Sequence, residues 1–504
     1  MFLTISLASL IYYLVSIIYR LFFHPLSKFP GPKLAAATRL YDFYYSVVRD
    51  GMYTWEIERM HKQYGPIVRI APDEIHINDA SFYNAIYTGG TNKREKYHTY
   101  VKGIALPNSV VSTLDHNHHN LRRKFVSNFF SKRSVTGIEP LIHRKIDKLV
   151  ERLDECRKTG SLANLSLFFH AMTIDVISHY AFGENYDFLN TEDLEKEVRE
   201  SLIALTLMFH LNRFLPFDAT FLQQIPVWIL QKVFPDAARF LTAKNRIRTQ
   251  AVQTIEGQKK PSDSTSKGET IFTALLSDEL PATERTADRL QDEGMFLLQA
   301  GSETTGQALG VTMFYILRDK TILARMKEEL EPLMPDSSKR PTMVELQALP
   351  YFSAVINEGF RLSYGTLTRL PRIAPDEALR YKSWTIPPGT PVSQSTYLIH
   401  TDPNLFPDPH SFNPDRWIEA GDQRSHLESS LVNFTKGRRQ CLGINLASTE
   451  IYLTVAHLVR WVDMDLDNTD LATIQPYRDR LVIIPEPGDY KVEVSVKDVR
   501  GVHA

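Results

Sequence analysis

The first residues of the chain form an uncharged apolar run that constrains the fold more than any other segment. The run from Phe2 to Tyr19 contains no charged residue, proline or glycine. As a helix rising about 1.5 Å per residue, it is long enough to cross about 30 Å of hydrocarbon. A cleaved signal peptide is the alternative, but no positive charge precedes the run and no small-x-small cleavage site follows it. We therefore predict an uncleaved transmembrane anchor over residues 1–23.

Charges and prolines directly after the run predict how the rest of the chain is attached. Arg20, Lys28, Lys33 and Arg39 all follow the run, and positive charge marks the cytoplasmic side of a membrane span. The body is therefore expected in the cytoplasm. Two prolines around a glycine, at 30–32, cannot continue a helix. We predict a proline-rich hinge over residues 24–38 and one folded domain over residues 39–504.

The composition excludes several classes of protein. Hydrophobic residues make up 43% of the 504 residues, which is ample for a sizeable core. Lys and Arg number 58 against 59 Asp and Glu, so no basic surplus points to nucleic acid as a partner. The two cysteines, Cys156 and Cys441, can form at most one disulfide, which excludes a disulfide-stapled secreted scaffold. A single cysteine with a special chemical role stays open.

Hydrophobic periodicity predicts a mainly α fold with small β-sheets, an α+β architecture built as one unit. Long segments with a 3.6-residue period, above all 162–182 and 287–317, predict helices. A polar stretch at 258–268 is typical of an exposed linker. The chain lacks the nucleotide, phosphate-loop, esterase and zinc-protease fingerprints, so electrons for redox chemistry must come from another protein. Short alternating or β-branched runs predict strands at 67–70, 75–77, 381–386, 481–484 and 490–496.

One segment, FTKGRRQCLG at 434–443, surrounds a cysteine with features that favour the thiolate. Cys441 precedes a helical run at 444–462, and Arg438 and Arg439 are close in sequence. The flanking glycines allow a tight turn that points backbone N–H groups at the sulfur. A nucleophile needs a nearby His base, which the local sequence lacks, whereas an axial iron ligand needs only the sulfur. A buried structural cysteine is the remaining alternative.

This segment resembles the cysteine-loop signature FxxGxRxCxG of the cytochrome P450 family of haem-thiolate monooxygenases. The resemblance implies the cytochrome P450 fold, haem b as the cofactor and the Cys441 thiolate as the axial iron ligand. It extends over residues 29 to about 497, and the phrase at 24–32 and the segment 175–183 are similar to fungal microsomal members of the trichodiene-oxygenase-like group. The fixed positions of the signature are filled by Phe434, Gly437, Arg439, Cys441 and Gly443.

A second motif of the family, ExxR, is formed by Glu358 and Arg361. Residues three positions apart lie on one face of a helix, so the two charges can pair. Taken alone the pattern is weak, because most such pairs are solvated surface pairs. In the family this pair joins an arginine from a later loop, and the sequence FNPDRW at 412–417 resembles that loop. The resemblance therefore implies a buried triad with Arg416 that supports the haem-side core and has no catalytic part.

A third motif, AGSETT at 300–305, lies in the middle of the longest helical pattern. Gly301 and the threonines are poor helix formers, and their cost beside a carboxylate hints at a function. A tolerated kink, with Thr304 bonding back to a carbonyl, is the alternative. The motif resembles the oxygen-activation motif of the family. It implies Glu303 and Thr304 as the catalytic residues that relay protons, with Gly301 letting the helix pass close to the haem face.

Basic residues from three segments resemble the family's contacts to the haem propionates. His119 and Arg123 stand four apart in a His-rich helix at 115–123, where a zinc site lacks ligands at the right spacing. Arg372 follows the ExxR helix, and Arg439 belongs to the cysteine loop. A planar guanidinium suits a carboxylate better than a lysine does. The resemblance thus implies these four residues as cofactor-binding side chains.

The resemblance implies a membrane-anchored monooxygenase of the endoplasmic reticulum that uses O2 to hydroxylate or epoxidise a hydrophobic small molecule. The expected pathway is fungal secondary metabolism, with a terpenoid or a mycotoxin-type polyketide as substrate. NADPH serves only indirectly, through NADPH-cytochrome P450 reductase as the partner. Its docking face is expected at the cysteine side. The basic residues expected there are Lys436, Arg438, Arg122 and Lys124.

The substrate cavity is expected to be lined by residues 104–111, 205–209, 296–298 and 367–368 and by the segment near Leu481. An apolar segment at 214–227 is expected to dip into the bilayer. Two other functions stay open. One is a reductase-independent haem-thiolate isomerase or peroxygenase, which Glu303 and Thr304 disfavour because such an enzyme needs no oxygen activation. The other is a non-catalytic haem-binding membrane protein.

Overall fold

The structure is a computed structural model of the chain. It describes residues 2–183, 186–191, 206, 208–215, 225–233, 235–257, 270–488 and 490–500. The predicted linker at 258–268 lies outside the described residues, and so does most of the apolar segment at 214–227. Residues 205 and 207, expected at the cavity, also lie outside them.

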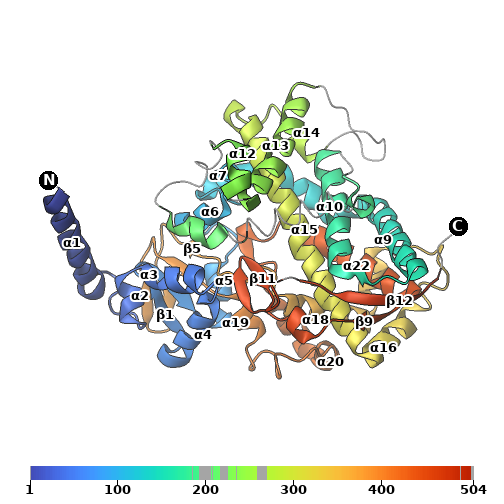
Figure 1. Cartoon of the computed structure of the whole chain (residues 1–504). Helices are drawn as coiled ribbons and strands as arrows, with labels where there is room; N and C mark the ends of the chain where they lie inside the picture. Colours follow the sequence, from blue (N-terminus) through green and yellow to red (C-terminus); the bar gives the residue numbers. More distant parts are fainter. Residues whose placement is uncertain are drawn as a thin grey trace.

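Helices dominate the described chain, and long ones form its centre (Figure 1). The longer helices are α1 (Phe2–Ile18), α4 (Tyr53–Tyr64), α6 (His98–Ile104), α7 (His116–Ser127), α9 (Glu139–Thr159), α10 (Leu165–Phe182), α12 (Val227–Val233), α13 (Pro235–Ile255), α15 (Ala287–Arg318), α16 (Lys320–Leu330), α18 (Pro350–Ser363) and α22 (Ile444–Trp461). Shorter ones are α2 (Lys33–Ala37), α3 (Leu40–Phe43), α5 (Tyr83–Ile86), α8 (Lys132–Gly137), α14 (Ile271–Ala274), α17 (Met343–Gln347), α19 (Thr396–His400), α20 (Asp415–Glu419) and α21 (Arg424–Ser429).

Helix α15 is the axis of the body, and α10, α13, α18 and α22 pack against it (Figure 1). The helix begins where the Thr286 side chain accepts a hydrogen bond from the Arg289 backbone N–H, which satisfies a donor that the helix itself leaves unpaired. Helix α10 is buried on nearly all sides, as its apolar sequence requires. The predicted helices at 287–317 and 162–182 thus correspond to α15 and α10, with small shifts at their ends.

Four small sheets lie beside the helices. The five-stranded sheet has the order β1-β2-β8-β5-β3, and the three-stranded sheet has the order β4-β12-β9. The pairs β6-β7 and β10-β11 complete the set. The strands are β1 (Ile67–Ala71), β2 (Glu74–Ile77), β3 (Glu95–Lys96), β4 (Ala163–Asn164), β5 (Arg372–Ile373), β6 (Leu379–Tyr381), β7 (Trp384–Ile386), β8 (Pro391–Ser393), β9 (Val462–Asp467), β10 (Arg478–Arg480), β11 (Val482–Ile484) and β12 (Glu493–Val499).

The predicted strands at 67–70 and 75–77 correspond to β1 and β2, which form an antiparallel pair in which Ile67 faces Ile77. Strand β2 pairs in parallel with β8, and β8 pairs antiparallel with β5. This order places β5 and β3 side by side, so that Arg372 pairs with Lys96 across the two strands. The prediction of a mainly α fold with small sheets is confirmed.

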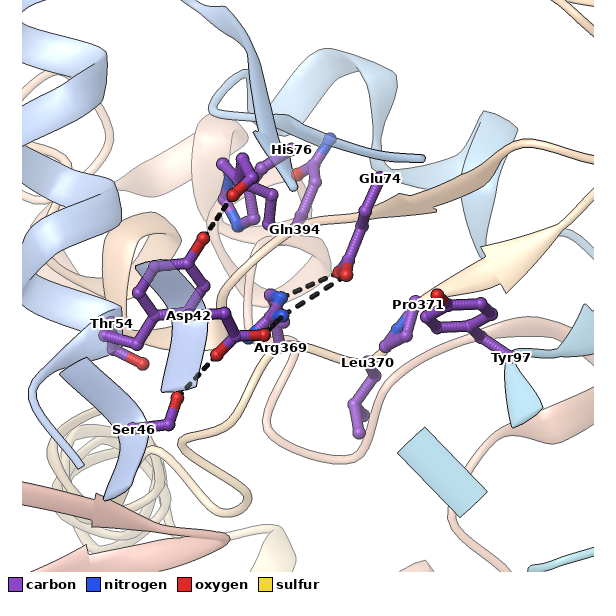
Figure 2. Close-up of polar contacts among 12 residues, drawn as sticks. Asp42, Ser46, Thr54, Glu74, His76, Tyr97, Arg369, Leu370, Pro371 and Gln394 are labelled. Carbon is purple, nitrogen blue, oxygen red and sulfur yellow. Dashed lines mark hydrogen bonds and ion pairs between the residues drawn. The ribbon is translucent and has the colours of Figure 1, made fainter. Parts of the chain in front are cut away.

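A buried ion cluster holds the segment that leads into β5. Arg369 lies between Glu74 of β2 and Asp42 of α3, at 2.7 Å and 3.1 Å (Figure 2). Ser46 donates a hydrogen bond to Asp42 at 2.6 Å. Burial works to raise the pKa of Asp42, but the charges of Arg213 and Arg369 hold that pKa well below its usual range. The cluster therefore ties segments far apart in the sequence to the turn before β5.

The N-terminal helix stands away from the body (Figure 1). Its window Ser6–Phe23 is the one helix among the described residues that is long and apolar enough to cross a membrane, and none of it is buried. This agrees with the predicted anchor. The following segment is fixed to the body, because the Arg69 backbone N–H donates to the Pro30 carbonyl at 2.7 Å. Phe29 also stacks on Trp384, with 4.9 Å between the ring centroids.

Candidate functional site

The predicted site residues gather around a cavity of about 310 Å³. The middle of α15, the start of α22, α7 and the loop at 433–443 supply its walls. A volume of this size suits a small-molecule or cofactor site. Of the residues predicted from the sequence, the walls include His119, Arg123, Glu303, Thr304, Arg372, Phe434, Arg439, Cys441 and Gly443.

The loop before α22 presents Cys441 to this cavity. The Cys441 backbone N–H donates to the Phe434 carbonyl at 2.9 Å, and the Gln440 N–H donates to the Gly437 carbonyl at 3.0 Å. Gly437 has a φ of +76°, and a Cβ there would meet the Thr88 carbonyl oxygen at 2.1 Å. A side chain at 437 would therefore force the loop away from residue 88. Phe434 packs edge-on against Phe360, with 5.2 Å between the ring centroids.

Cys441 is exposed in this structure and belongs to the lining of the cavity. Burial raises the pKa of this thiol, while the Gly443 backbone N–H and the charge of Arg123 act in the opposite direction. The sequence led us to expect that the loop around Cys441 lowers the pKa of the thiol. The net effect is the opposite, because desolvation raises this pKa more than the flanking charges lower it. A bound metal cation reverses this balance, since a coordinating thiol loses its proton.

Basic side chains crowd the wall near Cys441. Burial, with the charges of Arg439 and Lys96, lowers the pKa of His119 to about 2. Burial and the charge of Arg372 lower the pKa of Arg439 to about 9. Burial and the neighbouring arginines also lower the pKa of Lys96 well below its usual value. Burial is the largest cause of all three shifts, and the cationic neighbours lower the pKa values further, so several cationic side chains lie close together on this wall.

This wall fits a flat cofactor that carries carboxylates, such as haem. The buried Nδ1 of His119 finds no hydrogen-bond partner among the described residues, and a buried polar atom of this kind is costly unless a ligand satisfies it. The guanidinium of Arg123 donates to the Gln440 carbonyl at 2.8 Å, which ties α7 to the cysteine loop. The residues present are therefore compatible with an anionic haem, whose carboxylates would neutralise the cationic wall while Cys441 bound its iron.

Arg439 has a structural role in the cysteine loop that the sequence did not indicate. Its buried guanidinium donates four hydrogen bonds to the carbonyls of Arg94, Thr113, Leu114 and Asp115, at 2.7 to 3.2 Å. An arginine has five N–H donors, so most of its donors hold residues 94–115 against the cysteine loop. Lys96, which sequence reasoning missed, adds a further cationic side chain to the same wall.

Helix α15 brings an acidic residue and a hydroxyl group to the cavity, in contrast to the cationic wall. These residues are Glu303 and Thr304. The Thr304 hydroxyl donates to the Ala300 carbonyl at 2.9 Å, as the alternative reading of the motif proposed. The Glu303 Oε2 atom lies 2.9 Å from Nε2 of His170 on α10. A Cβ at Gly301 would approach Ile177 of α10 to 3.0 Å. The expectation that Gly301 only makes room at the haem face is thus incomplete, because the glycine also lets α10 pack closely.

Glu358, Arg361 and Arg416 meet in the interior of the protein. Arg361 holds Glu358 through two contacts, at 2.7 and 2.9 Å, and Arg416 reaches it at 3.1 Å. The Trp417 indole N–H donates to the same carboxylate at 2.9 Å. Glu358 and Arg361 are completely buried. The three charges therefore join α18 to α20 in the core, away from the cavity wall.

Two acidic residues at the start of α15 hold the loop at 105–115, and sequence reasoning missed them. Asp292 accepts hydrogen bonds from the Asn108 backbone and side chain, both at 3.0 Å, and pairs with Lys244 of α13 at 2.8 Å. Glu293 accepts the Val110 backbone N–H at 2.8 Å. The sequence around them, ADRLQDEG at 287–294, is polar and gave no signal that these two acids are buried. We name the group of Asp292, Lys244 and Asn108 the loop clamp.

The expected docking face is smaller than the sequence indicated. Arg122 is buried and pairs with Glu284 at 2.7 Å, so the prediction that it offers a free surface charge was wrong. Lys436 is half-buried and donates to the Ser429 carbonyl at 2.6 Å. Arg438 and Lys124 are exposed.

The apolar part of the cavity differs slightly from the expected lining. Leu367 and Thr368 do not belong to the cavity wall, and Thr368 instead donates to Asp479. Thr366 and Leu370 take their places. Expected residues that do line the cavity are Ile104, Val110, Val111, Phe296, Leu297 and Leu481.

Comparison with known proteins supports the class of protein that this fold and site define. A family model for cytochrome P450 matches residues 42–492, so the chain belongs to the cytochrome P450 family. It is accordingly a haem-thiolate monooxygenase, with a cysteine thiolate as the family's iron ligand.

Individual relatives cover nearly the whole chain. Conidiogenone synthase PchP450 of Penicillium rubens is 45% identical over 484 residues, covering 96% of each chain. The cytochrome P450 monooxygenase TRI4 of Fusarium sporotrichioides is 39% identical over 502 residues, covering 99% of this chain and 96% of the relative. A solved structure of retinoic acid-bound cyanobacterial CYP120A1 has a TM-score of 0.71 at 21% identity, covering 94% of this chain and 99% of that one, and it supports the fold alone.

Proposed function

We propose that this monooxygenase hydroxylates or epoxidises a hydrophobic terpenoid intermediate of fungal secondary metabolism. The carrying observation is that one cavity joins Cys441, a cationic wall, the Glu303–Thr304 pair and an apolar lining. The relatives include a conidiogenone synthase and TRI4 monooxygenases of fungi, which favours this substrate class. A mycotoxin-type polyketide remains the second candidate class of substrate.

In this proposal the chain's own residues divide the work. Cys441 holds the iron of haem b, and the wall of His119, Arg123, Arg372 and Arg439 holds its carboxylates. Bound haem supplies the redox chemistry by which one oxygen atom of O2 enters the substrate and the other leaves as water, with two electrons and two protons. Gly437, Gly443 and Phe434 shape the cysteine loop.

The remaining residues position the substrate, move protons and support the core. The apolar side chains of Ile104, Val110, Val111 and Phe296 place the substrate and exclude water. Glu303 and Thr304 move protons at the cavity face of α15. Glu358, Arg361 and Arg416 have the structural role described above.

The proposal assigns electron supply and location to other components. NADPH-cytochrome P450 reductase passes the electrons, because the described chain contains no flavin or nicotinamide fingerprint of its own. The segment Ser6–Phe23 anchors the protein in the endoplasmic reticulum membrane, with the catalytic domain in the cytoplasm.

The test is product analysis in yeast microsomes that contain the full chain and the reductase. Terpene hydrocarbons are supplied, and mass spectrometry searches for NADPH-dependent products that have gained one oxygen atom. The proposal expects such a product with wild-type protein and none with Cys441→Ser. Products that form from a hydroperoxide without NADPH or reductase would instead establish the peroxygenase or isomerase alternative.

A further inference from the structure

A buried histidine on α10 contacts the proposed proton-transfer residue from the side away from the cavity. Glu303 belongs to the cavity wall, while His170 does not. The two side chains are 21% and 5% exposed, and 2.9 Å separate His170 Nε2 from Glu303 Oε2. Glu303 thus lies between an imidazole and the space where the chemistry takes place.

The other ring nitrogen of His170 fixes which tautomer the ring adopts. His170 Nδ1 lies 2.6 Å from the Ser166 carbonyl oxygen. A carbonyl oxygen can only accept a hydrogen bond, so this short contact requires a proton on Nδ1. We assign the tautomer from this contact. A neutral ring with that tautomer carries a lone pair on Nε2, and a carboxylate oxygen of Glu303 lies 2.9 Å from this atom.

Two lone pairs at 2.9 Å repel each other unless a proton lies between them. Either Glu303 is protonated and donates to Nε2, or His170 is an imidazolium and donates to the carboxylate. In both states the pair carries two protons and no net charge. A neutral histidine beside an ionised glutamate would carry one proton fewer and a net charge of −1.

Close packing of α10 on α15 sets this contact. A Cβ at Gly306 of α15 would lie 3.1 Å from two ring atoms of His170, so the absence of a side chain at 306 leaves room for the imidazole. The Thr173 hydroxyl also contacts the Ser302 carbonyl at 3.3 Å and links the same helices. The position of His170 is therefore built into the interface between the two helices.

We propose that His170 is a positioning residue that holds Glu303 at the cavity wall and stores one proton with it for delivery into the cavity. This inference rests on the proposed role of Glu303 in proton transfer. When Glu303 gives its proton to an acceptor in the cavity, the pair keeps the proton on Nδ1 and carries a charge of −1. A proton from water restores the neutral pair.

One further titratable group is electrostatically coupled to Glu303. Burial, with the charges of Tyr315 and Glu303, raises the pKa of Tyr490 well above its usual value. Tyr490 packs over Gly310 of α15, where a Cβ would meet its ring at 3.1 Å. Its phenol is therefore neutral near pH 7 and adds no charge beside the His170–Glu303 pair.

The test reads protonation directly in the full-length holoprotein in lipid nanodiscs. The reduced carbon monoxide complex is labelled with 15N-histidine and studied by nuclear magnetic resonance, with His170→Gln to assign the ring. Infrared spectra of wild type and Glu303→Gln identify the carboxylic acid band of residue 303. We expect either an imidazolium at 170, or a ring protonated only on Nδ1 together with a carboxylic acid at 303.

Either of two results would overturn the inference. One is a neutral ring protonated on Nε2, and the other is a neutral ring beside an ionised Glu303. His457→Gln is the matched control, because His457 is equally buried and burial lowers its pKa to about 3, with no carboxylate partner among the causes. It should leave the His170 and Glu303 signals unchanged.

A second measurement separates proton storage from simple structural support. NADPH-driven oxygen consumption by the enzyme and reductase is followed from acid to neutral pH. In His170→Gln, Glu303 loses its stored proton as the pH rises through the normal carboxyl range, so the rate should fall about tenfold there. Wild type and His457→Gln should hold their rates over the same range, and identical profiles for wild type and His170→Gln would refute the storage role.

Failure of the proposed function looks different from failure of this inference. If the carbon monoxide complex lacks the spectrum of a thiolate-ligated haem, the proposed function itself fails. If that spectrum is normal but the His170–Glu303 pair carries a single proton, only the inference about His170 fails.

Discussion

At the residue scale, the decisive feature is a cavity wall on which several cationic side chains gather near Cys441. Arg372 is buried in this wall, and its guanidinium donates to the Pro371 carbonyl at 3.1 Å. Burial lowers the pKa of Lys96, His119 and Arg439, and the charge of Arg372 lowers these pKa values further. Such a wall is unfavourable in isolation and becomes favourable when an anion binds.

Arg372→Gln should weaken the retention of haem. A hydrogen bond to a charged group contributes about 1.5–3 kcal/mol, so we expect haem to transfer to excess apomyoglobin about 10 to 100 times faster than from wild type. Arg380→Gln is the control, because Arg380 is exposed in the β6 strand. Equal transfer rates for Arg372→Gln and wild type would contradict the assignment of Arg372 to the carboxylates.

Local motifs could be predicted at this scale, and distant pairs could not. The cysteine loop and the ExxR motif can be recognised in the sequence because the residues of each motif lie within ten positions of one another. Arg369 and Asp42 are 327 positions apart, and nothing in either segment indicates the other. His170 was missed because it lies in an apolar helical run, where a histidine is interpreted as an ordinary core residue. The direction of the Cys441 pKa was wrong because sequence does not show how strongly the fold desolvates the sulfur.

At the element scale, buried charges connect helices and loops that are distant in the sequence. The Glu358 cluster joins α18 to α20, and the loop clamp joins α15 and α13 to the loop over the cavity. Hydrophobic periodicity located the helices well, because a helix that is buried on one face has apolar residues at regular spacing. It did not reveal the clamp, since a buried acid and a surface acid look alike in sequence.

Glu358→Gln should severely destabilise the protein. Removing one partner of a buried ion pair costs about 3–5 kcal/mol, because Arg361 and Arg416 would keep buried charges without a counter-charge. Urea unfolding of the purified holoprotein should show this loss. Glu419→Gln, an exposed acid at the end of α20, should remain near wild type; a similar midpoint for both variants would show that the cluster is dispensable.

Asp292→Asn should loosen the loop over the cavity. The substitution leaves the buried Lys244 without its counter-charge and weakens the contacts to Asn108. We expect amide hydrogen exchange at residues 108–110 to accelerate about tenfold, since local opening free energy falls by about 1.4 kcal/mol. Adding Lys244→Met should restore part of the protein's stability but leave the loop exchange fast. Unchanged exchange in Asp292→Asn would exclude a clamping role.

At the scale of the whole molecule, one end of the body carries the N-terminal apolar helix together with further exposed apolar side chains. Helices α1, α2 and α3 are at this end (Figure 1). Large apolar side chains remain exposed beyond the anchor itself, and such patches are typical of surfaces that contact a partner or a membrane. They are Leu34, Leu40, Tyr44 and Val48.

Deleting residues 2–23 should change how the protein binds membranes without abolishing binding. The full chain should resist extraction by alkaline carbonate, as a spanning helix does. The truncated protein should be released by carbonate but still pellet with vesicles at neutral pH, because the apolar residues after the anchor remain. A truncated protein that is fully soluble would show that these residues do not touch the bilayer.

The central claim is that Cys441 ligates haem iron as a thiolate, and the carbon monoxide difference spectrum of the reduced full-length protein tests it most directly. Electron donation from a thiolate shifts the main haem absorption band of the carbon monoxide complex to longer wavelength. We predict this red-shifted band for wild type and its loss in Cys441→Ser. A wild-type spectrum without the shift, or a Cys441→Ser variant that keeps it, would contradict the account.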